Sequence, residues 1–289
     1  MCSKMGAVTA AFAALWFVAV VGRVAHAEIS ADCSMIDPNT TIDDEKQRAH
    51  LQNYFSSSFL FTPMNPAPGA GARSQVGIEL SLIPPLSCYE RLVEFGGQLK
   101  TENTNLSPVL PRPRLTVALP DAGPVHMALE AGFIPPIPLP IGIITHLGAA
   151  FSAGGEVVNN FALGGRAHFS MTRVRADVAT ATTPGGPEYD DLSYFSGFGA
   201  DFGASYRIIG KQHSWLTPYL WAGYGQTQTL FIVGDDLTLV QNTTYPWYGA
   251  TITAGGELSL LDNQLLLGFD VMCAVPVYAT LQFKIAYGF

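Results

Sequence analysis

The chain has 289 residues, only 13% of them charged, and its formal net charge at pH 7 is −8. Charged residues make up about a quarter of an ordinary soluble domain, so their scarcity argues against a purely water-exposed surface. The excess of acid argues against nucleic acid as a partner.

Residues 1–27 have the layout of a cleavable secretory signal peptide. Lys4 precedes the apolar run A-F-A-A-L-W-F-V-A-V-V, and small residues occupy the cleavage positions in Ala25-His26-Ala27. The apolar run is too short for a comfortable transmembrane helix, although a retained anchor is the alternative. We therefore predict export from the cytoplasm.

Residues 28–53 are predicted to form an N-terminal segment with a short helix. Asp43, Asp44 and Glu45 precede K-Q-R-A-H-L-Q-N, and the helix dipole favours acids at a helix start. The segment either lies in the periplasm or folds into a lumen as a plug. The sequence leaves both open.

From residue 54 to residue 289, large apolar residues alternate with polar or small ones, as in strands with one apolar face. The clearest segment runs from Asp191 to Ile209. The preferred count is twelve strands, with Tyr54–Phe61 as the first and Tyr89–Leu99 as another. Ten strands is the alternative, with those two segments in the N-terminal region and the first loop.

The last segment carries a more specific signal. Apolar residues alternate with polar or small ones up to the final aromatic residue, and these apolar positions are Leu281, Phe283, Ile285, Tyr287 and Phe289. This pattern resembles the C-terminal closing strand of bacterial outer-membrane β-barrel proteins, which their insertion machinery reads. The resemblance implies an all-β fold, a single transmembrane antiparallel up-and-down β-barrel over residues 54–289. It also implies location in the bacterial outer membrane, with outer-membrane lipids and the barrel-assembly machinery as partners. A soluble periplasmic β-sandwich is the competing fold.

The polar faces of the predicted strands carry charged and histidine side chains, which we expect to line the lumen. They are Glu79, Glu90, Glu94, Arg114, His126, Glu130, His146, Arg166, His168, Asp201, Arg207, Glu257, Asp270 and Lys284. These groups fit either a wet, mildly acidic pathway or a salt-bridged interior that conducts nothing.

Cys33 and Cys88 are a possible disulfide, because the twelve-strand arrangement places both at the periplasmic end of the barrel. The ten-strand arrangement places Cys88 outside and favours two unpaired thiols. Cys273 is expected on the lipid face as a small apolar residue.

Two groups of residues suggest possible catalytic or metal sites. His168 and Ser170, with Glu130 near them in strand order, suggest a base, a nucleophile and an orienting acid of a lipid hydrolase. His126, His146 and Glu130 suggest a metal site, but they lack a tight ligand spacing. We expect no catalytic residues, no cofactor and no metal.

The leading prediction for function is a porin-like passive pore for small solutes. The alternative is a non-conducting barrel that presents its outer loops for surface interactions, and an outer-membrane lipid hydrolase is third.

Overall fold

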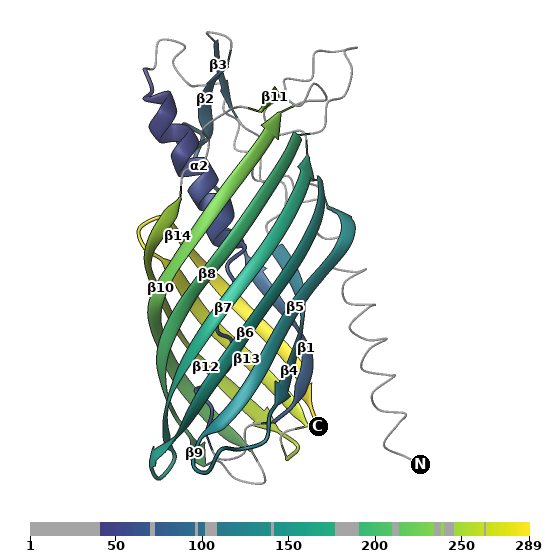
Figure 1. Ribbon diagram of the computed structural model, residues 1–289, viewed down its shortest axis with the longest axis vertical. Coiled ribbons are helices and arrows are strands. Elements are labelled where there is room, and N and C mark those ends of the chain that lie inside the picture. The colour runs from purple at the N-terminus through teal and green to yellow at the C-terminus, as the bar shows by residue number, and fades with distance from the viewer. Residues whose placement is uncertain are drawn as a thin grey trace.

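The computed structural model describes residues 41–69, 73–95, 98–101, 109–139, 142–176, 191–209, 214–233, 238–239, 246–262 and 264–289. The predicted signal peptide and Cys33 lie outside these ranges. Within them, ten long antiparallel strands form a closed barrel (Figure 1). They are β1 (Gln75–Leu82), β4 (Val109–Ala118), β5 (His126–Leu139), β6 (Gly142–Val158), β7 (Phe161–Ala176), β8 (Asp191–Tyr206), β10 (Trp215–Val233), β12 (Trp247–Leu260), β13 (Leu265–Ala274) and β14 (Tyr278–Gly288). Two short pieces, β9 (Ile208–Ile209) and β11 (Thr238–Leu239), pair with β10.

The barrel closes where its first strand meets its last. β1 and β14 pair antiparallel from Gln75↔Gly288 to Leu82↔Leu281, and the other ladders join strands that follow one another around the barrel. This up-and-down topology confirms the predicted fold class, with the alternative count of ten strands.

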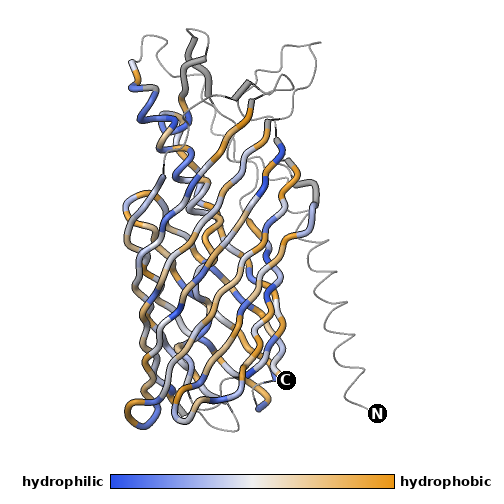
Figure 2. Tube along the Cα trace, in the orientation of Figure 1, coloured by the Kyte–Doolittle hydropathy of each residue, from blue (hydrophilic) through white to orange (hydrophobic). Residues whose placement is uncertain are grey.

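Side-chain direction follows the period of two along each strand. On β7, Phe169 and Met171 are 40% and 53% exposed, whereas Arg166, His168 and Ser170, which occupy the alternate positions, are buried. The alternation of apolar and polar positions is visible along the strands in Figure 2. The closing strand has the same arrangement, because Leu281, Phe283 and Ile285 face outward. The apolar faces therefore point away from the barrel interior, and a β-sandwich is excluded.

The two ends of the barrel differ in their connections. At the end where β14 finishes, the β6–β7 turn consists of residues 159–160, and Asn160 has a left-handed φ of 65°. Leu261 and Asp262 make a similarly tight turn between β12 and β13. At the opposite end the connections spanning 83–108, 177–190 and 234–246 are longer. We call these the short-turn end and the long-loop end.

Two segments predicted as barrel strands have other structures. Tyr54–Phe61 begins within the helix α2 (Asp44–Ser58), which also crosses the expected boundary at residue 53. The Asp43 side chain caps this helix by accepting from the backbone N–H of Lys46 at 3.3 Å. Tyr89–Leu99 spans the 3₁₀ turn η1 (Tyr89–Arg91) and part of a separate hairpin, β2 (Leu92–Phe95) and β3 (Gln98–Thr101), within the β1–β4 connection. Glu90 accepts hydrogen bonds from Ser87 in this connection, and the segment pairs with no strand of the barrel sheet.

Helix α2 begins at the long-loop end and descends into the barrel mouth (Figure 1). Residues 59–69 then continue through the lumen to the short-turn end, where β1 begins. Phe61 and Met64 have no exposed surface along this path. We call α2 and residues 59–69 together the plug. Among the described residues, no helix has the length and apolarity needed to cross a membrane.

Candidate functional site: the plugged lumen

The upper layer of the lumen is apolar and surrounds α2. Leu51, Tyr54 and Leu60 of the plug pack with wall residues from the last strands and the β1–β4 connection; these are Leu86, Trp247, Met272, Ala274 and Tyr278. On the other side, Phe59 packs with Leu110, Ile134, Ile144, Val174 and Phe195. Burial of these side chains stabilises the helix in the mouth of the barrel.

Two hydrogen bonds fix the position of α2 in this layer. The Tyr54 hydroxyl donates to the carbonyl oxygen of Pro84, which follows β1. Ser56 Oγ lies 2.8 Å from Thr227 Oγ1 on β10. The helix is therefore attached to two separate parts of the wall.

The central layer is built around the ring of Phe61. The guanidinium carbons of Arg114, Arg166 and Arg112 lie 4.1, 5.3 and 5.7 Å from its centroid. Cations at these distances are attracted to the negative face of an aromatic ring. Gly132 and Gly148 leave room for the ring, because a Cβ at either position would lie 2.6 or 2.5 Å from a Phe61 ring carbon.

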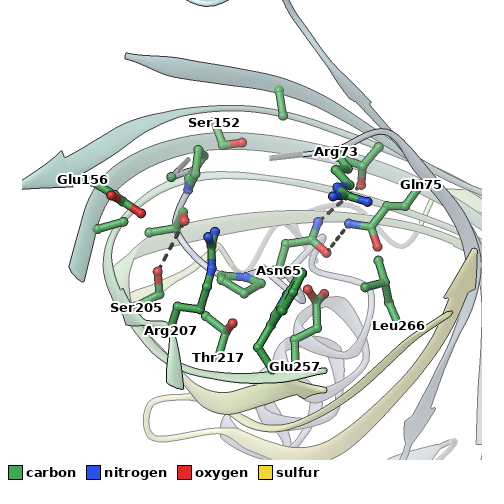
Figure 3. Close-up of a pocket in the computed structure, with 18 of the residues that line it drawn as sticks. Asn65, Arg73, Gln75, Ser152, Glu156, Ser205, Arg207, Thr217, Glu257 and Leu266 are labelled. Atoms are coloured by element: carbon green, nitrogen blue, oxygen red, sulfur yellow. Dashed lines mark hydrogen bonds between the residues drawn. The ribbon is translucent and has the colours of Figure 1, made fainter. Parts of the chain in front are cut away.

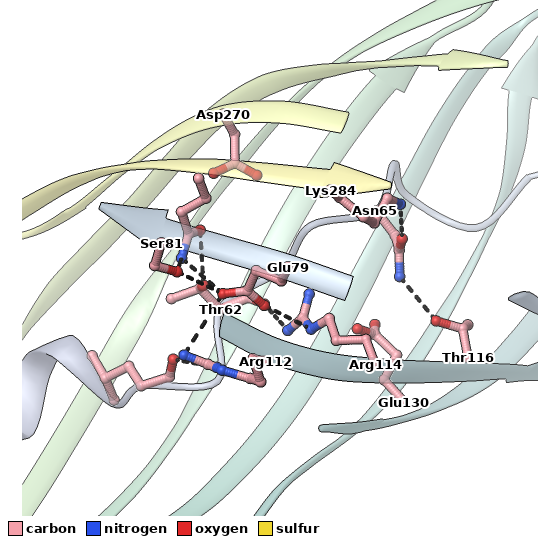
Figure 4. Close-up of polar contacts among 12 residues, drawn as sticks. Thr62, Asn65, Glu79, Ser81, Arg112, Arg114, Thr116, Glu130, Asp270 and Lys284 are labelled. Atoms are coloured by element: carbon pink, nitrogen blue, oxygen red, sulfur yellow. Dashed lines mark hydrogen bonds and ion pairs between the residues drawn. The ribbon is translucent and has the colours of Figure 1, made fainter. Parts of the chain in front are cut away.

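The same arginines also hold the plug backbone, and Figure 4 shows Arg112 and Arg114 beside it. Arg112 Nη1 donates to the Leu60 carbonyl at 3.1 Å, and Arg114 Nη2 donates to the Thr62 carbonyl at 2.5 Å. Arg166 Nη2 approaches the same Thr62 oxygen at 3.4 Å. In this layer the wall supplies charged donors for plug carbonyls that no regular secondary structure satisfies.

Three buried acids balance the three arginines. Glu79 lies 3.0 Å from Arg114 Nε and 3.6 Å from Arg112 Nη2. Glu130 and Asp201 lie 3.3 and 3.2 Å from Arg166. Buried charges are tolerated when they are paired, and each arginine here has an acid within 4 Å, although Arg112 Nε and Glu130 Oε2 are buried without a hydrogen bond among the described residues.

The lower layer is organised by Asn65 of the plug. Its Oδ1 accepts from Lys284 Nζ at 2.6 Å and from Gln75 Nε2 at 2.9 Å, and its Nδ2 donates to Thr116 at 3.3 Å. The Asn65 carbonyl accepts from Trp221 Nε1 at 2.9 Å. One plug residue thus contacts four wall strands.

Below Asn65 the lumen opens into a small cavity at the short-turn end (Figure 3). The cavity has a volume of about 120 Å³, and its lining includes Glu156, Arg207 and Glu257. Lys284 Nζ lies 2.5 Å from Glu257 Oε2 beside it. A volume of this size suits a few water molecules.

The structure brings most of the predicted lumen-lining residues into the barrel interior. They are Glu79, Arg114, Glu130, His146, Arg166, His168, Asp201, Arg207, Glu257, Asp270 and Lys284. In this structure the plug occupies the space between them.

Three of the predicted residues lie elsewhere. Glu90 is in η1, where it accepts hydrogen bonds from the hydroxyl and backbone N–H of Ser87, and these hold its pKa below the ordinary value. Glu94 is in β2, outside the barrel sheet. His126 is at the short-turn rim, where its Nδ1 lies 2.9 Å from Asp121. Neither Glu90 nor His126 contacts the central layer.

The sequence interpretation missed Phe61, Asn65 and Arg112. Phe61 and Asn65 were placed in the first strand and the loop after it. Arg112 lies two positions before Arg114 and therefore on the same face of the strand, and this spacing could have identified it as a lumenal residue. The prolines on either side, Pro111 and Pro113, made the segment resemble a loop, although β4 begins at Val109.

The two candidate sites of chemistry have other surroundings. His168, Ser170 and Glu130 are all buried in the lumen, and Glu130 is engaged by Arg166. His146 Nδ1 lies 2.8 Å from Thr172 Oγ1 and its ring stacks on Phe59, far from His126 at the short-turn rim. Across the ranges that the structure describes, no three metal-ligating side chains gather.

Cys88 is disulfide-bonded, and Cys273 is a free thiol. Cys33 lies outside the described residues, so its pairing with Cys88 stays a prediction. Cys88 is at the long-loop end, in the position for which the ten-strand arrangement favoured an unpaired thiol, so that expectation is wrong.

No protein-family model matches the chain, and no curated protein matches it. The solved structures that resemble it are outer-membrane β-barrels. The translocator domain of the autotransporter NalP from Neisseria meningitidis has a TM-score of 0.35 and 10% identity, covering 86% of this chain and 97% of that one. LpxR from Salmonella typhimurium has a TM-score of 0.33 and 7% identity, and the match covers 74% of this chain and 100% of that one. Ail, the attachment invasion locus protein of Yersinia pestis, has a TM-score of 0.30 and 11% identity, covering 75% and 95%. Likeness at this level identifies neither a family nor an activity.

Proposed function

We propose that this protein is an outer-membrane β-barrel that does not conduct through its lumen and that presents α2 and its long loops at the cell surface. The observation that carries the proposal is the central layer. There Phe61 is fully buried among three arginines that also hold the backbone of the plug. This reverses the order of the two leading functions expected from the sequence.

The orientation rests on the unequal ends of the barrel. In outer-membrane barrels the tight turns face the periplasm and the longer loops face outward. By that rule the long-loop end of this barrel faces outside, and α2 begins there. Gln47 Nε2 donates to the Tyr89 carbonyl at 3.0 Å, so α2 and the β1–β4 connection form one continuous surface at this end.

The three layers resist opening in different ways. Removing the plug exposes apolar surface in the upper layer and unpairs backbone carbonyls and arginines in the central layer. Below, it leaves Lys284 without the Asn65 amide oxygen. Each of these changes is unfavourable, so the closed state is the resting state of the barrel.

A gated passage is the second candidate. It is favoured by the cavity below Asn65, which continues the lumen to the short-turn end with Arg207, Glu156 and Glu257 on its walls. If the plug moves, the lumen becomes a charged channel of the kind that the sequence predicted. The two candidates share the resting structure and differ in whether the plug leaves it.

Conductance in planar bilayers tests the closed resting state of the barrel. We expect the unmodified protein to remain silent under applied voltage, and we expect Phe61→Ala to produce stepwise channels because it removes the ring at the centre of the plug. Phe283→Leu on the outward face of β14 is the matched control and should stay silent. Steady channels from the unmodified protein would contradict the closed resting state.

Surface presentation is tested with two inserted epitopes. An epitope between Thr41 and Ile42, ahead of α2, should bind antibody on intact cells. An epitope at Gly123, in the exposed β4–β5 turn, should bind only after the outer membrane is permeabilised. The reverse pattern would contradict the proposed orientation.

A further inference from the structure

The outward face of β7 changes character near the long-loop end. It is apolar or small from Phe161 through Met171, and Arg173 and Arg175 follow on the same face, both exposed. The ten residue-to-residue steps from Phe161 to Met171 correspond to about 25 Å along the membrane normal at the usual strand tilt, which is the height of the apolar band of such barrels. Arg173 is therefore placed at the boundary between outer-leaflet hydrocarbon and headgroups.

A groove lies beside Arg173 on this outer face. It has a volume of about 410 Å³ and is shared by β6, β7, β8 and β10. One row of the register runs Thr145, Arg173, Tyr194 and Leu230 across these strands, and the next row runs Leu147, Met171, Ser196 and Gln228. The small Ser196 side chain between Met171 and Gln228 leaves the depression.

The two rows of the groove differ in chemistry. Arg173 and Tyr194 supply a cation and a hydroxyl on the side nearer the long loops, and Gln228 lies in the other row. Leu147 and Met171 supply apolar surface on the side nearer the middle of the band. An amphipathic ligand with an anionic end and a hydrocarbon end matches both.

Arg173 is the charged group available to such a ligand. Its cross-strand neighbours are Thr145 and Tyr194, neither of which is acidic. A guanidinium facing the edge of the hydrocarbon region is unfavourable unless water or an anion accompanies it. Arginine also offers the planar pair of N–H donors that suits phosphate oxygens.

We propose that this groove binds a phosphate-bearing lipid of the outer leaflet, with the phosphate on Arg173 and an acyl chain against Leu147 and Met171. The partner is a lipid and not free phosphate, because the apolar side of the groove has no role for an inorganic ion. The site is on the opposite face of the wall from the plug. It goes beyond the proposed function and relies only on the barrel being in a membrane.

The test measures lipid retained by the full-length protein in detergent micelles. Phosphatidic acid is titrated in and bound lipid is counted by native mass spectrometry, with diacylglycerol as the lipid that lacks the phosphate. We expect phosphatidic acid to bind, diacylglycerol to bind at least tenfold more weakly, and Arg173→Gln to weaken phosphatidic acid binding about tenfold. Lys46→Gln, which removes one exposed cation from α2, is the charge-matched control and should have no effect.

A second variant tests the groove separately from the charge. Ser196→Leu fills the depression and keeps Arg173, so it should also weaken binding. Folding of each variant is checked by heat-dependent migration on a gel, and bilayer silence should be unchanged because neither side chain touches the plug. The proposal would be overturned if Arg173→Gln or Ser196→Leu bound phosphatidic acid as tightly as the unmodified protein. It would also be overturned if diacylglycerol bound as tightly as phosphatidic acid, or if millimolar inorganic phosphate displaced the lipid completely.

Discussion

The fit between Phe61 and Gly148 gives the most direct test of how the plug is held. A methyl group at residue 148 would lie 2.5 Å from Phe61 Cδ2 and 2.7 Å from Cγ, well inside van der Waals contact. Gly148→Ala should therefore force the ring out of place, at a cost of about 1–3 kcal/mol typical of overpacking. Phe61→Ala removes the ring altogether and should cost about 3–5 kcal/mol, because the side chain is fully buried.

The double variant distinguishes this contact from general damage. When Phe61 is already alanine, the methyl group at residue 148 has space, so Gly148→Ala should cost almost nothing further. The expected coupling between the two changes is about 1–3 kcal/mol, or roughly 5–150-fold in the equilibrium for plug opening. Gly165→Ala is the control, since a Cβ there meets only the Asp201 carbonyl at 4.0 Å.

Plug opening is measured by the rate at which a maleimide labels Met64→Cys, because Met64 is completely buried in the lumen. Cys273 is replaced by serine so that the outward thiol does not react. Labelling should be slow in the otherwise unmodified barrel, faster in Gly148→Ala, and fastest in Phe61→Ala. If Gly148→Ala accelerates labelling equally with and without the Phe61 ring, the contact does not hold the plug and the reasoning is refuted.

Three further outcomes are expected. Glu79→Gln leaves three buried arginines with two acids, so it should lower the free energy of unfolding in urea titrations by about 3–5 kcal/mol. Adding Arg112→Gln should restore part of this stability, and no recovery would argue against the pairing of Glu79 with Arg112. Asn65→Ala should raise the labelling rate of the plug, since lost buried hydrogen bonds cost about 1–3 kcal/mol, and an unchanged rate would show that the lower layer does not hold it. Phe283→Arg puts a charge on the lipid face of the closing strand and should destabilise the barrel in lipid vesicles by about 2–4 kcal/mol, whereas Phe283→Leu should not. Equal stability of the two variants would mean that this face does not contact hydrocarbon.

The sequence predicts the facing of the strands well because the period of two is imposed locally and repeated. On β7 and β14 the residues expected outside are outside, including Phe169, Met171 and Phe283. Each of these side chains is sorted by its own apolar or polar character. No knowledge of a distant partner is needed to place them.

Strand number and pairing depend on contacts with residues far away in the sequence, and the alternation pattern alone could not predict them. The run Y-F-S-S-S-F-L-F suits a strand as well as a helix, and it is helical up to Ser58 because Tyr54 and Ser56 meet Pro84 and Thr227. The sequence predicts the lumenal positions of Arg114 and Arg166, but not the target that these arginines share with Arg112. That target is the ring and the backbone carbonyls of a segment whose composition carries no charge to signal the contact.

The route of the plug has a consequence for biogenesis. The chain crosses the lumen before β1 starts, and β1 completes the barrel by joining β14 at the other end of the sequence. The plug is continuous with β1, so the docking of β1 onto β14 and the placement of the plug in the lumen involve the same stretch of chain.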